Sequence, residues 1–331
     1  MVSRRLTREP EPKIRMRRVY QKALHRLRPL HGFNPQLMVA LLRQWSDRGV
    51  LKNYVTQTSI AHLPREKLME IPMPVPPDSE QRAIATALSD VDALLNGLDQ
   101  LIAKKRDLKQ AAMQQLLTGQ TRLPGFHGKW EVMRLGEVCW FQEGPGVRKT
   151  QFTTTGIKLL NGTNIFRGTL NLDTTTRFIS KTEAYGPYAH FMAEEGDIVL
   201  ASSGVTIDRL HEKVAFVKQE NLPFCMNTST IRFKPLPGNL CSEFLFQFLV
   251  GDEFKSQVGG VATGSAQLNF GPSHVEKVAL SVPPLPEQTA IAEILSDMDA
   301  EIAALEARRD KTRALKQGMM QELLTGRTRL I

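Results

Sequence analysis

The sequence has 331 residues, of which 41% are hydrophobic, and its formal net charge at pH 7 is +9. This length allows two domains of ordinary size. No apolar run approaches the ~20 residues of a membrane-spanning helix, and no signal-peptide pattern opens the chain. Three scattered cysteines, Cys139, Cys225 and Cys241, argue against a disulfide framework and a zinc cluster. We therefore expect a cytoplasmic chain with no membrane contact and no bound metal.

The positive charge is concentrated at the N-terminus. Residues 1–35 contain ten Lys and Arg but only two Glu, and the rest of the chain is nearly neutral. The overall charge is therefore weak evidence for a nucleic-acid ligand. Binding of that kind has to be argued from particular loops.

A block of sequence occurs twice without a gap, first from Gln36 to Leu123 and again from Glu243 to Leu330. Its clearest part is VPPDSEQRAIATALSDVDALL from Val75, which returns as VPPLPEQTAIAEILSDMDAEI from Val282. A duplication this long predicts two copies of one supersecondary unit, related by an approximate two-fold axis.

Each copy predicts one long helix. Apolar residues alternate at spacings of four and three, Pro-Pro pairs stop any helix from entering, and Gly119 and Gly326 mark the ends. At 1.5 Å per residue, the helix from Glu80 to Leu117 is roughly 55 Å long. The two helices can pack on each other only if they run antiparallel, because one precedes and the other follows the intervening segment. The alternative is two separate amphipathic helices, each on its own domain.

The residues expected at the seam between the helices, and at a subunit interface built on them, are Ile84, Leu88, Val91, Leu95, Leu98, Ile102, Ile291, Leu295, Met298, Ile302 and Leu305.

The intervening segment, Pro124 to Lys277, has mixed α and β character. Strands are expected at Gly156–Leu160, Asp197–Ala201, Lys213–Val217 and Ser229–Phe233, and a helix at Ser242–Phe254. The fold class is therefore α+β, with a mixed α/β domain, an antiparallel coiled coil of the two long helices and an internal pseudo-two-fold repeat.

Several motifs together resemble one family. They are the Pro-Pro-x-x-Glu-Gln openings at Pro76 and Pro283, the Leu-Leu-Thr-Gly ends at Leu116 and Leu323, WEVMRLGEV from Trp130, EGDIVLASSG from Glu195 and NTSTIRF from Asn227. The chain resembles the specificity subunit of a type I restriction-modification system. That resemblance implies a non-catalytic subunit that reads duplex DNA and recruits methyltransferase and restriction subunits. It binds no cofactor itself, and S-adenosylmethionine, ATP and Mg²⁺ are expected on the partners.

The resemblance also implies a layout. Residues 1–70 are expected to be the remnant of a first target-recognition domain, whose front is missing, with 1–35 as its basic segment. Residues 71–123 form the first helical spacer, 124–277 the complete second recognition domain and 278–331 the second spacer. Leu41, Leu42 and Trp45 in the remnant are expected to lack a full core, which favours self-association or pairing with another chain.

The DNA contacts are expected in loops between strands. Asn and Gln can bond adenine bidentately, Arg and Lys can bond guanine, and Gly lets the backbone approach phosphates. For each residue, an ordinary solvated turn is an equally good interpretation. The candidates are Gly144, Gly146, Arg148, Lys149, Asn161, Asn164, Ser202, Ser203, Arg209, Thr263, Ser265, Gln267 and Asn269.

No catalytic motif accompanies these loops. GPGVRKT, from Gly144, differs from a phosphate-binding loop at Glu143 and Arg148. Glu195 and Asp197 lack the Lys that a nuclease carboxylate pair would need. Two hypotheses follow, a DNA-reading subunit without catalytic activity, and a dimeric coiled-coil scaffold or inactive fragment that binds protein instead of DNA.

Overall fold

The computed structural model describes residues 25–56, 62–261 and 267–330. They fall into two compact units. The first unit consists of Met1–Gly97 and Arg309–Ile331, and the second consists of Leu98–Arg308. The boundary crosses both long helices, so each unit contains one part of each.

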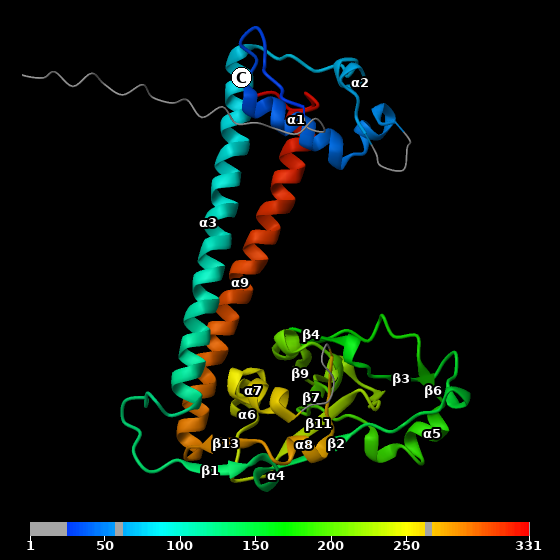
Figure 1. Cartoon of the computed structure of the whole chain (residues 1–331), viewed down its shortest axis with the longest axis vertical. Coiled ribbons are helices and arrows are strands. Elements are labelled where there is room, and N and C mark those ends of the chain that lie inside the picture. Colours follow the sequence, from blue (N-terminus) through cyan, green and yellow to red (C-terminus); the bar gives the residue numbers. More distant parts are fainter. Residues whose placement is uncertain (1–24, 57–61, 262–266, 331) are drawn as a thin grey trace, which may run out of the picture. The chain divides into compact units, whose positions relative to one another are not determined.

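The two long helices are α3 (Asp78–Leu117) and α9 (Leu285–Leu323), which pack against each other (Figure 1). In the first unit, Lys316 Nζ lies 2.5 Å from Asp92 Oδ1. In the second unit, Lys109 Nζ lies 2.6 Å from Asp299 Oδ1 and Lys105 Nζ lies 2.7 Å from Glu301 Oε1. In the second unit, the higher residue number on α3 pairs with the lower number on α9. In the first unit, Glu80 near the start of α3 bonds to Arg329 just beyond the end of α9, whereas Asp92 bonds to Lys316. The predicted antiparallel pairing is confirmed.

The ends of the helices are fixed by contacts that occur twice. Gln81 Nε2 donates to Pro76 O at 2.9 Å, and its counterpart Gln288 donates to Pro283 O at 2.8 Å. The preceding glutamates also match, because Glu80 accepts two hydrogen bonds from Arg329 and Glu287 accepts two from Arg122. Each pair joins the start of one repeat to the tail of the other. The repeated Glu-Gln and Thr-Arg-Leu motifs therefore build the same joint in each unit.

The first unit has a small core built around α1 (Pro35–Asp47). Leu37 and Leu41 are buried against Ile84 and Leu88 of α3 and Leu323 of α9. The expectation that Leu41 lacks a core is wrong, because the ends of the long helices supply the apolar surface. Leu42 and Trp45 are half-buried. The short helices η1 (Val50–Tyr54) and α2 (Arg65–Met69) complete this unit.

The second unit contains a four-stranded antiparallel sheet in the order β2 (Cys139–Glu143), β11 (Thr230–Pro235), β7 (Ile198–Ala201) and β9 (Val214–Phe216). The helices α6 (Ser242–Val250) and α7 (Asp252–Val261) belong to the same core, which contains the buried rings of Phe233, Phe244 and Phe248. The predicted helix over Ser242–Phe254 is interrupted at Gly251, where the backbone is extended and the chain starts a new helix.

A three-stranded sheet, in the order β10, β3, β6, has its own small core around Leu159, Ile179 and Cys225. The remaining pairs are β1 with β13, β12 with β8 and β4 with β5. The bounds of these strands are β1 (Glu131–Arg134), β3 (Ile157–Leu159), β4 (Ile165–Phe166), β5 (Thr169–Leu170), β6 (Phe178–Ile179), β8 (Ser203–Val205), β10 (Phe224–Cys225), β12 (Leu268–Asn269) and β13 (Ala279–Val282). The short helices are α4 (Leu135–Val138), η2 (Lys149–Gln151), η3 (Gly162–Asn164), α5 (Lys181–Tyr185), η4 (Ala189–Phe191), η5 (Ile207–Lys213), η6 (Gln219–Asn221) and α8 (Pro272–Val275).

Candidate nucleic-acid interface

Small polar residues gather at one end of the four-stranded sheet, where β2 and β7 end and β11 begins. The Gly144 N–H donates to Thr230 O at 3.1 Å, and the Ser202 N–H donates to Ser229 O at 2.9 Å. These bonds attach the turn before β11 to the ends of both neighbouring strands. Three loops that are far apart in the sequence therefore meet at this end of the sheet, which we call the polar edge.

Asn227 connects a fourth segment to this edge. Its Nδ2 donates to Asn161 Oδ1 at 2.8 Å, while Ser229 Oγ accepts from the Gly162 N–H at 3.3 Å. Thr228, between these two residues, is exposed. The side chains of the turn thus fix the backbone and leave Thr228 at its tip in contact with solvent.

The pairing of β8 with β12 brings two more segments together. Ser203 Oγ lies 2.7 Å from Asn269 Oδ1, and the Gly204 N–H donates to the same oxygen at 3.3 Å. Ser203, Gln267 and Asn269 are all exposed. Exposed amides and hydroxyls on fixed strands are the groups that hydrogen-bond to base edges.

Two glycines allow the segments to come this close. A Cβ at Gly144 would lie 2.4 Å from Asn227 N, and one at Gly162 would lie 2.9 Å from Ala201 Cβ. Gly144 is buried, so its lack of a side chain serves packing within the protein and not an approach to phosphate. Gly146 is exposed beside Thr228 and leaves the tip of its loop open.

A patch of basic and aromatic residues is formed by Phe166, Arg167 and Arg209. The guanidinium carbons of Arg167 and Arg209 lie 5.2 and 6.0 Å from the centroid of the exposed Phe166 ring. Both guanidinium groups donate to Glu212, at 2.9 and 2.8 Å. Burial raises the pKa of Glu212, but the hydrogen bonds from the two arginines outweigh this effect and the net pKa is lowered. Both arginine side chains remain more than half exposed.

Lys213 joins the patch to the polar cluster. Its Nζ donates to Gly162 O at 3.1 Å and to Ile165 O at 2.8 Å, and burial lowers its pKa. The segment from Asn161 to Arg167 therefore runs from one group of polar residues to the other on a single fixed backbone.

The structure places the expected contact residues at different sites. Asn161, Ser203, Gln267 and Asn269 lie together in the polar cluster, with Gly144, Gly146 and the buried Ser202 forming its backbone. Arg209 belongs to the basic patch. Arg148 and Lys149 are exposed on the loop after Gly146. Thr263 and Ser265 lie outside the described residues.

The side chain of Asn164 forms its hydrogen bonds within the protein. It is 3% exposed, its Nδ2 donates to Asn171 O at 2.9 Å and its Oδ1 accepts from the Asn161 N–H at 3.0 Å. In this conformation Asn164 holds a turn and has no exposed edge to offer a base.

The sequence interpretation missed Phe166, Arg167, Asn227 and Thr228. A weak signal existed for the first two, since an aromatic and a basic residue lie between the Asn161–Asn164 turn and Gly168. Asn227 and Thr228 belong to the NTSTIRF motif, whose sequence alone does not distinguish side chains that bond within the protein from side chains that face solvent.

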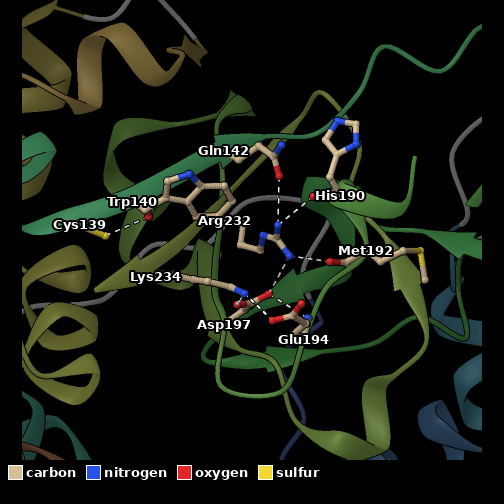
Figure 2. Close-up of polar contacts among 9 residues, drawn as sticks. All are labelled: Cys139, Trp140, Gln142, His190, Met192, Glu194, Asp197, Arg232 and Lys234. Atoms are coloured by element: carbon tan, nitrogen blue, oxygen red, sulfur yellow. Dashed lines mark hydrogen bonds and ion pairs between the residues drawn. The ribbon is translucent and has the colours of Figure 1, made fainter. Parts of the chain in front are cut away.

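A buried ionic network surrounds Arg232 of β11 in the second unit (Figure 2). Arg232 and Asp197 are almost fully buried, with Arg232 Nη1 3.2 Å from Asp197 Oδ2. The same guanidinium donates to Met192 O at 2.5 Å, to His190 O at 3.0 Å and to Gln142 Oε1 at 3.1 Å. The network attaches the segment from His190 to Met192 to the sheet, so Asp197 has a structural role.

No three His, Cys, Asp or Glu side chains in residues 25–56, 62–261 and 267–330 are arranged to hold a metal ion. Burial raises the pKa of both the Cys139 and Cys225 thiols to about 12, which disfavours the reactive thiolate. No helix in this described part of the chain is long and apolar enough to cross a membrane.

Comparison with known proteins identifies the family. The model of the type I restriction modification DNA specificity domain matches residues 19–105 and 127–312, which is most of the chain. The chain belongs to this type I specificity family. A curated relative, the specificity subunit of the type I restriction enzyme MjaVIII of Methanocaldococcus jannaschii, is 27% identical over 289 residues, covering 85% of this chain and 67% of that subunit.

Two solved structures support the fold of this specificity family member. The type I restriction-modification S subunit from M. genitalium has a TM-score of 0.56 at 17% identity, over 88% of this chain and 73% of the other. A chain from a study of complex assembly and conformational transition in the type I R-M system has a TM-score of 0.54 at 16% identity, over 88% of this chain and 70% of the other.

Proposed function

We propose that this specificity family member reads the sequence of duplex DNA with its second unit and performs no chemistry itself. The observation that carries the proposal is the polar edge of the four-stranded sheet. Next to it, Ser203 and Asn269 are exposed on the paired strands β8 and β12, Gln267 is exposed just before β12, and the Arg167–Arg209 patch adjoins this edge through Lys213. The amides and hydroxyls would contact base edges, while the arginines would contact phosphates.

The long helices would provide the assembly surface for methyltransferase and restriction subunits. The residues expected at the seam are buried or half-buried, so a partner would have to use other positions. Leu101, Leu108 and Ile294 in the second unit are exposed apolar side chains on α3 and α9. Exposed apolar residues on a paired helix surface favour docking of further helices. The partners would bring S-adenosylmethionine, ATP and Mg²⁺.

The four-part layout, 1–70, 71–123, 124–277 and 278–331, is part of this proposal. Residues 124–277 would read DNA and the two spacers would position that reading domain against the partner subunits. Because its proposed ligand is DNA and its proposed partners act on DNA, we place the protein in the cytoplasm.

A coiled-coil scaffold that binds protein and not DNA is the competing function, and a salt titration separates the two. Binding to a duplex should weaken steeply with salt, since log K falls by about 0.9 per phosphate contact for each unit of log salt. Arg167→Ala with Arg209→Ala should reduce this slope by about 2. Lys129→Ala, which removes an exposed lysine outside the proposed patch, serves as the matched control. A chain that does not bind duplex DNA at 50 mM salt would support the scaffold.

A further inference from the structure

The first unit contains an apolar groove beside the start of α3 and the end of α9. It encloses about 270 Å³, and its lining includes Val75, Glu80, Gly326 and Arg329. Val75 is 71% exposed although it opens one of the two repeated motifs. Its counterpart in the second unit, Val282, is only 8% exposed. The two repeats are therefore covered differently, and the second repeat indicates what would cover the first.

In the second unit, the covering element is a strand preceded by tryptophan. Strand β1 pairs antiparallel with β13, with Glu131 opposite Val282. Trp130, immediately before β1, donates from Nε1 to Glu287 Oε2 at 3.1 Å, and its ring centroid lies 5.4 Å from the guanidinium carbon of Arg122. The ring also covers Gly119, where a Cβ would meet the indole at 3.1 Å.

All three residues that contact this indole have counterparts in the first unit. Gly326 corresponds to Gly119, Glu80 to Glu287 and Arg329 to Arg122. Glu80 and Arg329 form the same paired hydrogen bonds, yet among the described residues a Cβ at Gly326 would meet nothing within 4 Å. The first unit thus has a receptor of the same composition with open space where the indole lies in the second unit.

The backbone beside the groove is also arranged for pairing with a strand. In the second unit, the Leu135 N–H donates to Val278 O at 2.8 Å, whereas the Ala279 N–H turns away to Gln257 Oε1. Alternation along an antiparallel ladder then directs residues 278, 280 and 282 toward β1.

The counterparts of those three residues are Ile71, Met73 and Val75, which all have an N–H group, while prolines occupy only the alternate positions 72 and 74. In the described residues, no strand pairs with residues 71–75. Proline at the non-pairing positions is compatible with an edge strand that accepts a partner on one side only.

We propose that this groove binds an extended segment of a partner polypeptide in which a tryptophan is followed by a β-strand, the chemistry of Trp130–Arg134. The indole would fill the space over Gly326 and donate to Glu80, and the strand would pair with residues 71–75. The chain's own tryptophans are Trp45, Trp130 and Trp140, and residues 1–24 contain none. Trp45 packs in the core of the first unit and Trp130 already covers the second.

A labelled peptide with the sequence of residues 127–138, HGKWEVMRLGEV, tests the proposal by fluorescence anisotropy with the intact protein. We expect saturable binding that weakens at least about tenfold when the peptide's tryptophan is replaced by alanine. N-methylation of the amide matching Met133, which faces the edge, should weaken binding about tenfold, and N-methylation at the position of Val132 should leave it unchanged.

Protein variants locate the site. Val75→Pro removes an edge donor in the first unit only and should abolish binding, whereas Pro74→Ala, at the alternate position, should not. Absence of binding, or equal loss from both methylated peptides, would overturn the proposal. Binding that requires removal of residues 1–24 would assign the groove to the chain's own N-terminal segment. Binding that requires dissociation of a dimer would assign it to a second copy. Either result overturns the partner in trans.

Discussion

At the scale of single residues, the buried pair Arg232–Asp197 determines how the segment from His190 to Met192 is attached to the sheet. Both side chains are at most 5% exposed. Asp197→Ala would leave the guanidinium buried without its anion, which typically costs about 3–5 kcal/mol of folding free energy. We expect a loss of that size in chemical denaturation.

Glu194→Ala is the matched control for that substitution. Glu194 pairs with the same Lys234 that approaches Asp197, but its side chain is 69% exposed. Loss of an exposed pair should change the unfolding free energy by less than about 1 kcal/mol. Equal losses of unfolding free energy from both variants would contradict a special contribution of the buried Arg232–Asp197 pair.

Glu212 predicts a response to acid. Its pKa in the folded protein lies below the ordinary value of 4.5 because the hydrogen bonds from Arg209 and Arg167 outweigh the effect of burial. A lowered folded pKa stabilises the protein above the ordinary value, and this stabilisation disappears as the pH falls through the folded pKa.

Denaturation at pH 6 and at pH 3 should therefore differ less for Glu212→Gln than for the parent chain. An unchanged difference would mean that Glu212 does not contribute to the acid response. Glu220→Gln, which alters an exposed carboxylate of the same unit, is the control.

At the scale of elements, two adjacent residues of α9 separate the seam from the outer surface. Leu295 is fully buried and Ile294 is exposed. Leu295→Asp would place a charge in an apolar seam and should lower the unfolding free energy by roughly 3–5 kcal/mol. Ile294→Asp should change it by less than about 0.5 kcal/mol. Thermal denaturation of the isolated chain measures both.

The same pair tests the proposed docking surface. If partner subunits bind the outer face of the helices, Ile294→Asp should reduce co-purification with a methyltransferase subunit while leaving the chain folded. Normal assembly of this variant would exclude that face.

The elements most accessible from sequence were the long helices. Their periodicity and the repeated Pro-Pro and Gly signals give the start and end of each helix, because local chemistry determines both. The break at Gly251 was not predicted, although glycine is a common helix end, because apolar residues on both sides of it pack in one core. The core around Leu41 was also missed, because it uses residues from α9 that lie far along the chain.

At the scale of the whole molecule, the sequence predicted which loops carry polar residues but not which side chains face outward. Asn161 and Asn164 are three positions apart in one turn, and only the structure reveals that both side chains are bonded within the protein. Arg167 was missed because its importance depends on Arg209 and Phe166, which tertiary contacts bring together. Long-range pairing of this kind leaves no pattern in a single sequence.

Selection from a random duplex library with the intact chain tests most directly whether the second unit reads base sequence. At moderate salt we predict enrichment of one short motif. Gln267→Ala should relax the preference at a single position, with a loss of discrimination of about 1–3 kcal/mol there. Arg167→Ala should weaken binding to all sequences alike. A library that shows no enriched motif while the chain still binds duplex DNA would contradict the claim.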